Sequence, residues 1–183
     1  MKSSVIAAIA VVVIVVAAAG GYYAYASTRG GEVYVYVEDP GHSNSSVLGI
    51  YLTVSSIMVH SSTTGKWITI SNRSETVALS SVPQLLASSS IPQGNYTEVR
   101  LYITSVTVQV GSINVSARVP SSVLKIPIVN GGLSVRPGRK AYLVISMGPH
   151  VTQTGSGAWL VSPVAVAYAY YNQSFTSTNT TSA

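Results

Sequence analysis

Alternation of side chains with a period of two is the feature that most constrains this chain. In Glu32–Glu38 every second residue is a valine, and the residues between the valines are tyrosines. Successive side chains of a β-strand point to opposite faces of its sheet, so this period indicates strands with one buried face. Much of the chain after residue 30 repeats the pattern, which predicts an all-β domain.

Further segments of strand character follow, separated by clusters of glycine, proline, asparagine and serine. These segments are Val47–His60, Lys66–Ile70, Glu75–Leu79, Tyr96–Val110, Ile113–Val119, Val123–Val129, Ala141–Met147 and Trp159–Tyr170. Asn130-Gly131-Gly132 and Pro137-Gly138 supply the residues that tight turns require. Many short strands with frequent turns are typical of an antiparallel β-sandwich, which is the architecture we predict.

Three positions interrupt the regular pattern. In Tyr96–Val110 the apolar residues change from odd to even positions near Thr104-Ser105, which predicts a β-bulge or a tight bend. Pro163 cannot donate a backbone hydrogen bond, so it predicts an edge position or a bulge in the last strand. Ser81–Ala87 starts with a capping serine and has a proline in its first turn, and we expect one short helical stretch there.

The N-terminus predicts export. Lys2 precedes fifteen consecutive apolar residues, and a small-x-small sequence with Ala24 and Ala26 then stands before Ser27. This order predicts an N-terminal hydrophobic helix that is either a cleaved signal peptide or a retained membrane anchor. Both alternatives place the domain that follows outside the cell.

The chain therefore divides into three parts. Residues 1–26 are the predicted signal peptide or anchor, and residues 27–171 are the predicted β-sandwich domain. Residues 172–183 are polar and rich in serine and threonine, which is typical of a flexible tail.

Six of the seven asparagines begin the glycosylation sequence Asn-x-Ser/Thr. They are Asn44, Asn72, Asn95, Asn114, Asn172 and Asn179. A chain rich in serine and threonine forms some of these sequences by chance, but not on nearly every asparagine. Because N-glycosylation marks exposed loops of exported proteins, we expect these residues to carry glycans.

Scarcity of charge limits the chemistry that this chain can perform. Only 8% of its residues are charged, against roughly 25% in an average soluble domain, and it has five acids and no cysteine. Thiol catalysis, disulfides and cysteine-bound metals are therefore excluded. The net charge of +5 is spread along the sequence except at Arg136–Lys140, which we interpret as a solvated hairpin turn. We expect no nucleic-acid partner.

The three histidines predict no catalytic or metal site. His42 lies near Asp39, but without an oxyanion element this pair is more typical of a polar loop. His60 and His150 are too far apart in sequence to match a short zinc motif. Glycosidase chemistry needs two facing carboxylates, and Glu75 and Glu98 carry no pattern that singles them out. We expect no catalytic residues, no metal and no cofactor.

Aromatic residues are the remaining candidates for binding. Trp67 and Trp159 could stack on sugar rings, but tryptophans on strands more often belong to the core. Five tyrosines could form an aromatic binding face or cover a sheet beneath glycans. They are Tyr34, Tyr36, Tyr168, Tyr170 and Tyr171.

Several short motifs occur in a distinctive order. A first strand that ends in Asp39-Pro40 precedes VLGIYLTVSSIMVHS (residues 47–61), GKW (65–67), IPQGNYTEVRLYI (91–103) and VPSS (119–122). This order, over about residues 31–168, resembles a family of exported prokaryotic β-sandwich domains of unknown function. The family usually has a residue between the aspartate and the proline, which Asp39-Pro40 lacks. The resemblance implies the same fold and brings no catalytic residues.

A looser similarity is to the subunits of archaeal surface threads. It rests on the export signal, the dense glycosylation sequences, the all-β body and a tyrosine-rich apolar strand near a terminus. Those subunits are glycosylated β-sandwich proteins joined head to tail by donor-strand complementation. The similarity implies that a strand of one copy fills a groove in the next. Candidate donors are Gly21–Ala26 with its linker, or Val164–Tyr171, which is alternatively the domain's own last strand.

These features predict an extracellular, glycosylated structural protein of the cell surface. One form is a filament subunit whose partners are copies of itself, assembled by donor-strand complementation. The alternative is a membrane-anchored monomeric module for binding or adhesion. An enzyme is the least favoured class because titratable groups are so scarce.

Mass spectrometry of protein recovered from native cells tests the glycosylation prediction. We expect peptides that contain the six sequon asparagines to carry added glycan mass, and the peptide with Asn130 to serve as the unmodified control. Unmodified asparagines at all six positions would contradict the prediction.

Overall fold

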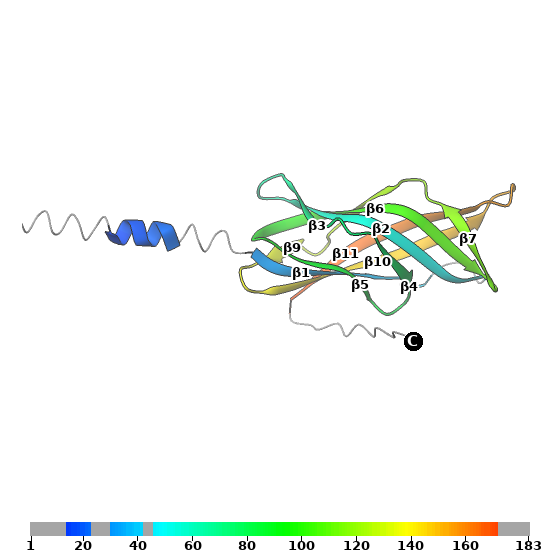
Figure 1. Ribbon diagram of the computed structural model, residues 1–183, viewed down its shortest axis with the longest axis horizontal. Helices are drawn as coiled ribbons and strands as arrows, with labels where there is room; N and C mark the ends of the chain where they lie inside the picture. The colour runs from blue at the N-terminus through cyan, green and yellow to red at the C-terminus, as the bar shows by residue number, and fades with distance from the viewer. Residues whose placement is uncertain (1–13, 23–29, 42–45, 172–183) are drawn as a thin grey trace, which may run out of the picture.

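The computed structural model describes residues 14–22, 30–41 and 46–171, in which it forms eleven strands (Figure 1). The strands are β1 (Gly30–Glu38), β2 (Val47–Ser61), β3 (Trp67–Ser71), β4 (Glu75–Leu79), β5 (Gln84–Pro92), β6 (Gly94–Val110), β7 (Ile113–Arg118), β8 (Val123–Pro127), β9 (Leu133–Val135), β10 (Lys140–Gln153) and β11 (Trp159–Tyr170). The prediction of an all-β fold is confirmed.

The N-terminal segment is described in part. Residues 14–22 are helical, whereas the cleavage region at Ala24, Ala26 and Ser27 lies outside the described residues. None of the helical structure within the described ranges is long and apolar enough to cross a membrane.

The strands form one sheet that folds back on itself in two layers. β2 and β6 are central in the first layer, where β3 and β4 pair with β2, and β7, β8 and β9 pair with β6. β5, β1, β10 and β11 form the second layer in that order. The layers join where β11 pairs with β7, at Trp159↔Ala117 and Leu160↔Arg118. The order of strands begins at β3 and ends at β5. These two edge strands lie near each other but are not paired, so the sheet is nearly but not fully closed.

The hydrophobic core lies between the two layers and consists of alternate side chains. Val33, Val35 and Val37 of β1 are fully buried, as are Val99 and Leu101 of β6. Apolar side chains from both layers join these residues in one continuous cluster. Full burial of such a side chain contributes about 1.5–3 kcal/mol, so the period-two pattern both orients the strands and stabilises the fold.

β1 lies between two partners that are distant in sequence. It pairs in parallel with β10, from Glu32↔Lys140 to Glu38↔Ser146, and antiparallel with β5 on its other side. The predicted antiparallel pairing therefore holds for most ladders but not for β1–β10 or for the short β7–β11 ladder. No hairpin joins these strands, so sequence proximity does not dictate their direction.

The irregularity predicted near Thr104-Ser105 is confirmed as a β-bulge within the single strand β6. Thr53 pairs with Ser105 and Val54 with Ile103, so the register skips Thr104. Ile103, before the bulge in the sequence, and Val106, after it, are both buried. The extra residue lets both halves of β6 face the same core.

The edge position predicted for Pro163 is also confirmed. Pro163 lies opposite Pro149 of β10. On the side away from β10, the contacts of β11 with described residues are at Leu160, which pairs with β7, and at Ala167, which forms a bridge to Ile128. Pro163 lies between these two contacts. The missing N–H of the proline therefore interrupts no ladder between described strands.

The helical stretch predicted for Ser81–Ala87 is wrong, because β5 begins at Gln84. The Ser80 carbonyl accepts a hydrogen bond from the backbone N–H of Asp39, and the chain then runs antiparallel along β1. Leu86 and Ile91 point into the core. A helix cap contributes about 1 kcal/mol, less than two buried apolar side chains, so the tertiary contacts prevail over the local signal.

Two leucines test whether the core governs stability. Leu143 of β10 is fully buried between the layers, whereas Leu48 of β2 is 64% exposed. We expect Leu143→Ala to lower the free energy of unfolding by about 2–5 kcal/mol, because it removes buried surface and leaves a cavity. The matched control Leu48→Ala should change it by less than about 0.5 kcal/mol. Urea unfolding of both variants measures the difference, and similar effects would contradict this core.

Candidate functional site

The titratable residues singled out in the sequence do not converge. His42 lies outside the described residues, and the Asp39 carboxylate accepts a hydrogen bond from the Gly41 N–H at 2.9 Å. His60 is on β2 of the first layer and His150 on β10 of the second. Within the described ranges no three histidine, aspartate or glutamate residues are grouped as metal ligands.

The two candidate carboxylates lie far apart. Glu75 pairs with Val54 of β2, and Glu98 pairs with His60 of the same strand. Six residues of strand span roughly 20 Å, which exceeds the separation of about 5–9.5 Å that glycosidases use. These two residues therefore do not form a glycosidase pair in this fold.

The two tryptophans occupy different environments. Trp159 is 9% exposed and belongs to the core, as expected, whereas Trp67 is half-buried on the outside of the first layer. The Arg100 guanidinium carbon lies 3.8 Å from the centroid of the Trp67 ring, and the His60 ring packs 4.9 Å away. Glu98 approaches the Arg100 Nε at 3.6 Å. Because the arginine covers one face of Trp67, that face is not free to stack on a sugar.

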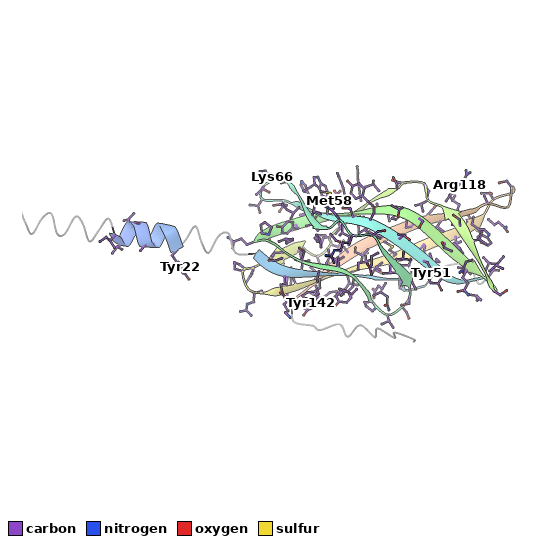
Figure 2. All side chains as sticks on the ribbon, viewed as in Figure 1. Tyr22, Tyr51, Met58, Lys66, Arg118 and Tyr142 are labelled. Carbon is purple, nitrogen blue, oxygen red and sulfur yellow. The ribbon has the colours of Figure 1, made fainter. Side chains whose placement is uncertain are left out.

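Four of the five candidate tyrosines meet on the outside of the second layer. We define the tyrosine face as the outward side chains Tyr34, Tyr36, Tyr142, Tyr168 and Tyr170. Tyr142 lies opposite Tyr34 of β1 and Tyr170 of β11. The Tyr34 and Tyr142 rings stack at 5.4 Å between centroids, and Tyr36 lies 6.5 Å from Tyr142. Figure 2 shows Tyr142 and Met58 on opposite outer sides of the sandwich.

The tyrosine face has a small buried layer of its own. Tyr36 is 5% and Val144 is 3% exposed, although neither belongs to the central core cluster. Val144 lies between Tyr36 and Tyr168 in register, so the surrounding aromatic side chains shield it. Burial raises the pKa of the Tyr36 hydroxyl above its ordinary value of 10.0, with smaller contributions from Tyr142 and Tyr34.

A charged pair borders one end of this face. The Lys140 ammonium lies 3.9 Å from the Glu32 carboxylate and 5.5 Å from the centroid of the Tyr34 ring. The Tyr34 hydroxyl donates a hydrogen bond to the same carboxylate at 3.0 Å. The pKa of Lys140 is raised, first by the charge interaction with Tyr34 and its hydrogen bond and then by Glu32.

Towards its other end the outer side of β10 and β11 is hollow. A depression of about 320 Å³ lies over Gly148 and is lined by residues that include Ser146, His150 and Val164. Val164 is 61% exposed. The outside of the second layer therefore combines partly buried tyrosines and the exposed Val164 with few charges, which suits contact with another molecule more than chemistry.

Tyr171 has a separate role. Its hydroxyl oxygen accepts a hydrogen bond from the Ser134 N–H at 2.8 Å and lies 3.4 Å from the Gly132 carbonyl oxygen. It therefore fastens the end of β11 to β9.

Sequence reasoning missed Tyr142, since its segment reads as an ordinary strand. The register of β1 and β10 is the signal that identifies it, and this register is not visible in the sequence.

Three of the glycosylation candidates lie within the described residues, and all three are exposed. Asn72 follows β3, Asn95 is on β6 and Asn114 is on β7. All three belong to the first layer, so no described sequon lies on the layer that carries the tyrosine face. Asn44, Asn172 and Asn179 are outside the described residues.

The model of a family described as a domain of unknown function, DUF4382, matches residues 30–163. The chain belongs to this family. The match runs from β1 into β11 and includes three members of the tyrosine face, but it ends before Tyr168 and Tyr170. The expected membership in a family of domains of unknown function is thereby confirmed. No curated protein and no solved structure matches the chain.

The buried Tyr36 predicts a loss of stability in alkali. An unfolded tyrosine releases its proton near pH 10, whereas the pKa of folded Tyr36 is higher, so the folded state binds more protons above that pH. The stabilising contribution is complete below about pH 10 and is lost as pH rises through the folded pKa. We expect Tyr36→Phe to reduce the alkaline loss while changing stability at pH 7 by less than about 1.5 kcal/mol.

Urea unfolding of the wild type and Tyr36→Phe between about pH 8 and 11.5 measures this effect. Tyr96→Phe is the companion variant, because burial also raises the pKa of Tyr96. It additionally loses the 2.7 Å hydrogen bond from the Tyr96 hydroxyl to the Pro92 carbonyl, so its stability should already fall at pH 7. Equal alkaline slopes for Tyr36→Phe and the wild type would count against the burial of Tyr36.

Proposed function

We propose that this member of the DUF4382 family is an exported, glycosylated structural protein of the cell surface whose copies join by exchanging β1. Support comes from the N-terminal apolar sequence, the exposure of Asn72, Asn95 and Asn114, and the pairing of β1. The pairing of β1 with β10 and β5 is the strongest support for the exchange.

β1 is independent of its neighbour in the chain. It pairs with β10 and β5 of the second layer, whereas β2, the next strand, belongs to the first layer. The connection runs from Asp39 to Ser46 and begins with Pro40 and Gly41, whose φ of 148° is a conformation that glycine favours. Transfer of β1 to another copy would leave the ladders among β2–β11 unchanged, because β1 takes part in none of them.

Exchange is favoured because the slot between β5 and β10 cannot remain empty. β1 contributes the fully buried Val33, Val35 and Val37, and its backbone satisfies the facing edges of β5 and β10. A neighbour's β1 supplies the same contacts, so exchange costs little beyond the loss of freedom on association. If each β1 enters the next copy in one direction, the contact does not close and a filament results.

A second form of the proposal is the membrane-anchored monomer that binds a partner. The tyrosine face supports it, because an apolar outer surface with no described sequon on its layer is open to contact. In this form β1 stays in its own domain. β11 is the domain's own last strand, paired with β10 along its length, and is therefore not the donor that we propose.

Engineered disulfides distinguish the two forms, since the chain has no cysteine of its own. Glu32 of β1 lies opposite Ser90 of β5, and its N–H points to the other side, to the Arg139 carbonyl. The pair is thus of the non-hydrogen-bonded type, whose Cα atoms lie about 4.5 Å apart, within disulfide reach. We expect Glu32→Cys/Ser90→Cys protein from cell surfaces to form a ladder of covalent multimers on non-reducing gels.

Thr53→Cys/Thr76→Cys is the matched control. These threonines pair between β2 and β4 with their hydroxyls 2.9 Å apart, and exchange of β1 does not separate them. This variant should run as a monomer under the same conditions. Monomers alone from both variants would overturn the exchange and leave the anchored form.

A further inference from the structure

One end of the sandwich brings the basic run Arg136–Lys140 together with Lys66, which is distant from it in the sequence. The described residues include eight lysines and arginines: Lys66, Arg73, Arg100, Arg118, Lys125, Arg136, Arg139 and Lys140. We define the basic pole as Lys66, Arg136, Arg139 and Lys140, which is half of this set. All four are exposed.

The β9–β10 turn brings three of these residues against the start of β1. The Gly138 N–H donates to the Gly30 carbonyl at 3.3 Å, and the Glu32 N–H donates to the Arg139 carbonyl at 3.0 Å. At Gly31 any side chain would collide with the Arg136 carbonyl oxygen. The glycine therefore allows the basic turn to close on the first residues of the domain.

Lys66 reaches the same end through another turn. The Ser62 N–H, in the β2–β3 turn, donates to the Asn95 carbonyl at 2.9 Å, and Asn95 pairs with Ser134 of β9. Figure 2 shows Lys66 and Arg118 at opposite ends of the sandwich. The fold thus adds Lys66 to the basic run that the sequence already shows at Arg136–Lys140.

The charges of the basic pole are poorly neutralised. Lys140 has Glu32 at 3.9 Å, whereas Arg136 and Arg139 form no ion pair with a carboxylate of the described residues. A hollow of about 670 Å³ lies between them, and its lining also includes Ser134 and Tyr171. Guanidinium groups without a carboxylate partner are suited to bind phosphate oxygens.

We propose that the basic pole binds the phosphate headgroups of an anionic phospholipid surface, the one from which the chain projects. In the sequence, residues 27–29 alone separate the predicted anchor from Gly30. An extended chain spans at most about 3.6 Å per residue, so the pole stays within roughly 14 Å of the membrane interface. The inference rests on the anchored form of the proposed function and extends it by assigning the domain an orientation.

Fluorescence quenching in nanodiscs tests this orientation. The full chain carries a single label at Thr63→Cys, in the exposed turn of the basic pole, and the lipid carries a headgroup quencher. The control label is at Ser156→Cys, in the β10–β11 hairpin at the opposite end of the sandwich (Figure 1). The nanodiscs contain phosphatidylcholine alone or with phosphatidylglycerol.

We expect quenching at position 63 to be several-fold stronger in the anionic than in the neutral nanodiscs, and quenching at position 156 to be weak in both. Because salt screens exposed charges, about 0.5 M salt should remove most of the difference between the two kinds of nanodisc. Arg136→Ser/Arg139→Ser should lower the equilibrium constant for docking of the domain on the lipid roughly thirty-fold, as expected for two basic residues at a membrane surface. Arg73→Ser/Arg118→Ser removes the same net charge away from the basic pole and should retain the quenching.

Three results would overturn the inference. Equal quenching in neutral and anionic nanodiscs would show that the tether alone holds the domain near the lipid. An equal loss in both double variants would show that net charge, rather than this surface, is responsible. Release by millimolar inorganic phosphate at constant ionic strength would assign the pole to a free anion.

The anchored form has its own readout in this experiment. A chain that does not co-purify with nanodiscs lacks the anchor, and the inference then falls with it. A chain that co-purifies but shows no quenching at position 63 keeps the anchored form and loses the inference alone.

Discussion

The insertion of β1 between β5 and β10 is the contact on which the rest of the second layer depends. β1 is the first strand of the domain, yet its parallel partner β10 follows about a hundred residues later. Closing so long a loop comes before the pairing can stabilise the fold, and non-local strand pairs form slowly for this reason. Until β10 is present, β1 has only one of its two strand partners, β5. This late pairing is a reason to propose β1 as the strand that copies exchange.

The local elements could largely be predicted from the sequence because each depends on nearby residues. Alternating side chains identified β2, β6 and β11, and the change of phase at Thr104 identified the bulge. The direction of β1 against β10 could not be predicted, since it depends on residues far apart in the chain. The helix expected at Ser81–Ala87 was wrong for the same reason. The capping signal is local, whereas pairing with the edge of β1 gives Leu86 and Ile91 a place in the core.

The candidate surfaces were predictable only in part. Tyr34, Tyr36, Tyr168 and Tyr170 could be proposed from alternation, because residues of equal parity on one strand share a face. Tyr142 completes that face through the register of three strands. The environment of Trp67 likewise depends on Arg100, which arrives from another strand. Surfaces that a single strand builds are visible in sequence, whereas surfaces built across strands become visible only with the register.

Scarcity of charge gives the position of each charged group more weight. In a chain with five acids, cations at one end find few carboxylates to pair with, so Arg136 and Arg139 keep their charge available. The described sequons lie on the first layer and the tyrosines on the second, so the two layers differ in what they present to the surroundings. The basic pole is a third distinct surface, and it lies at the end of the sandwich where β1 begins.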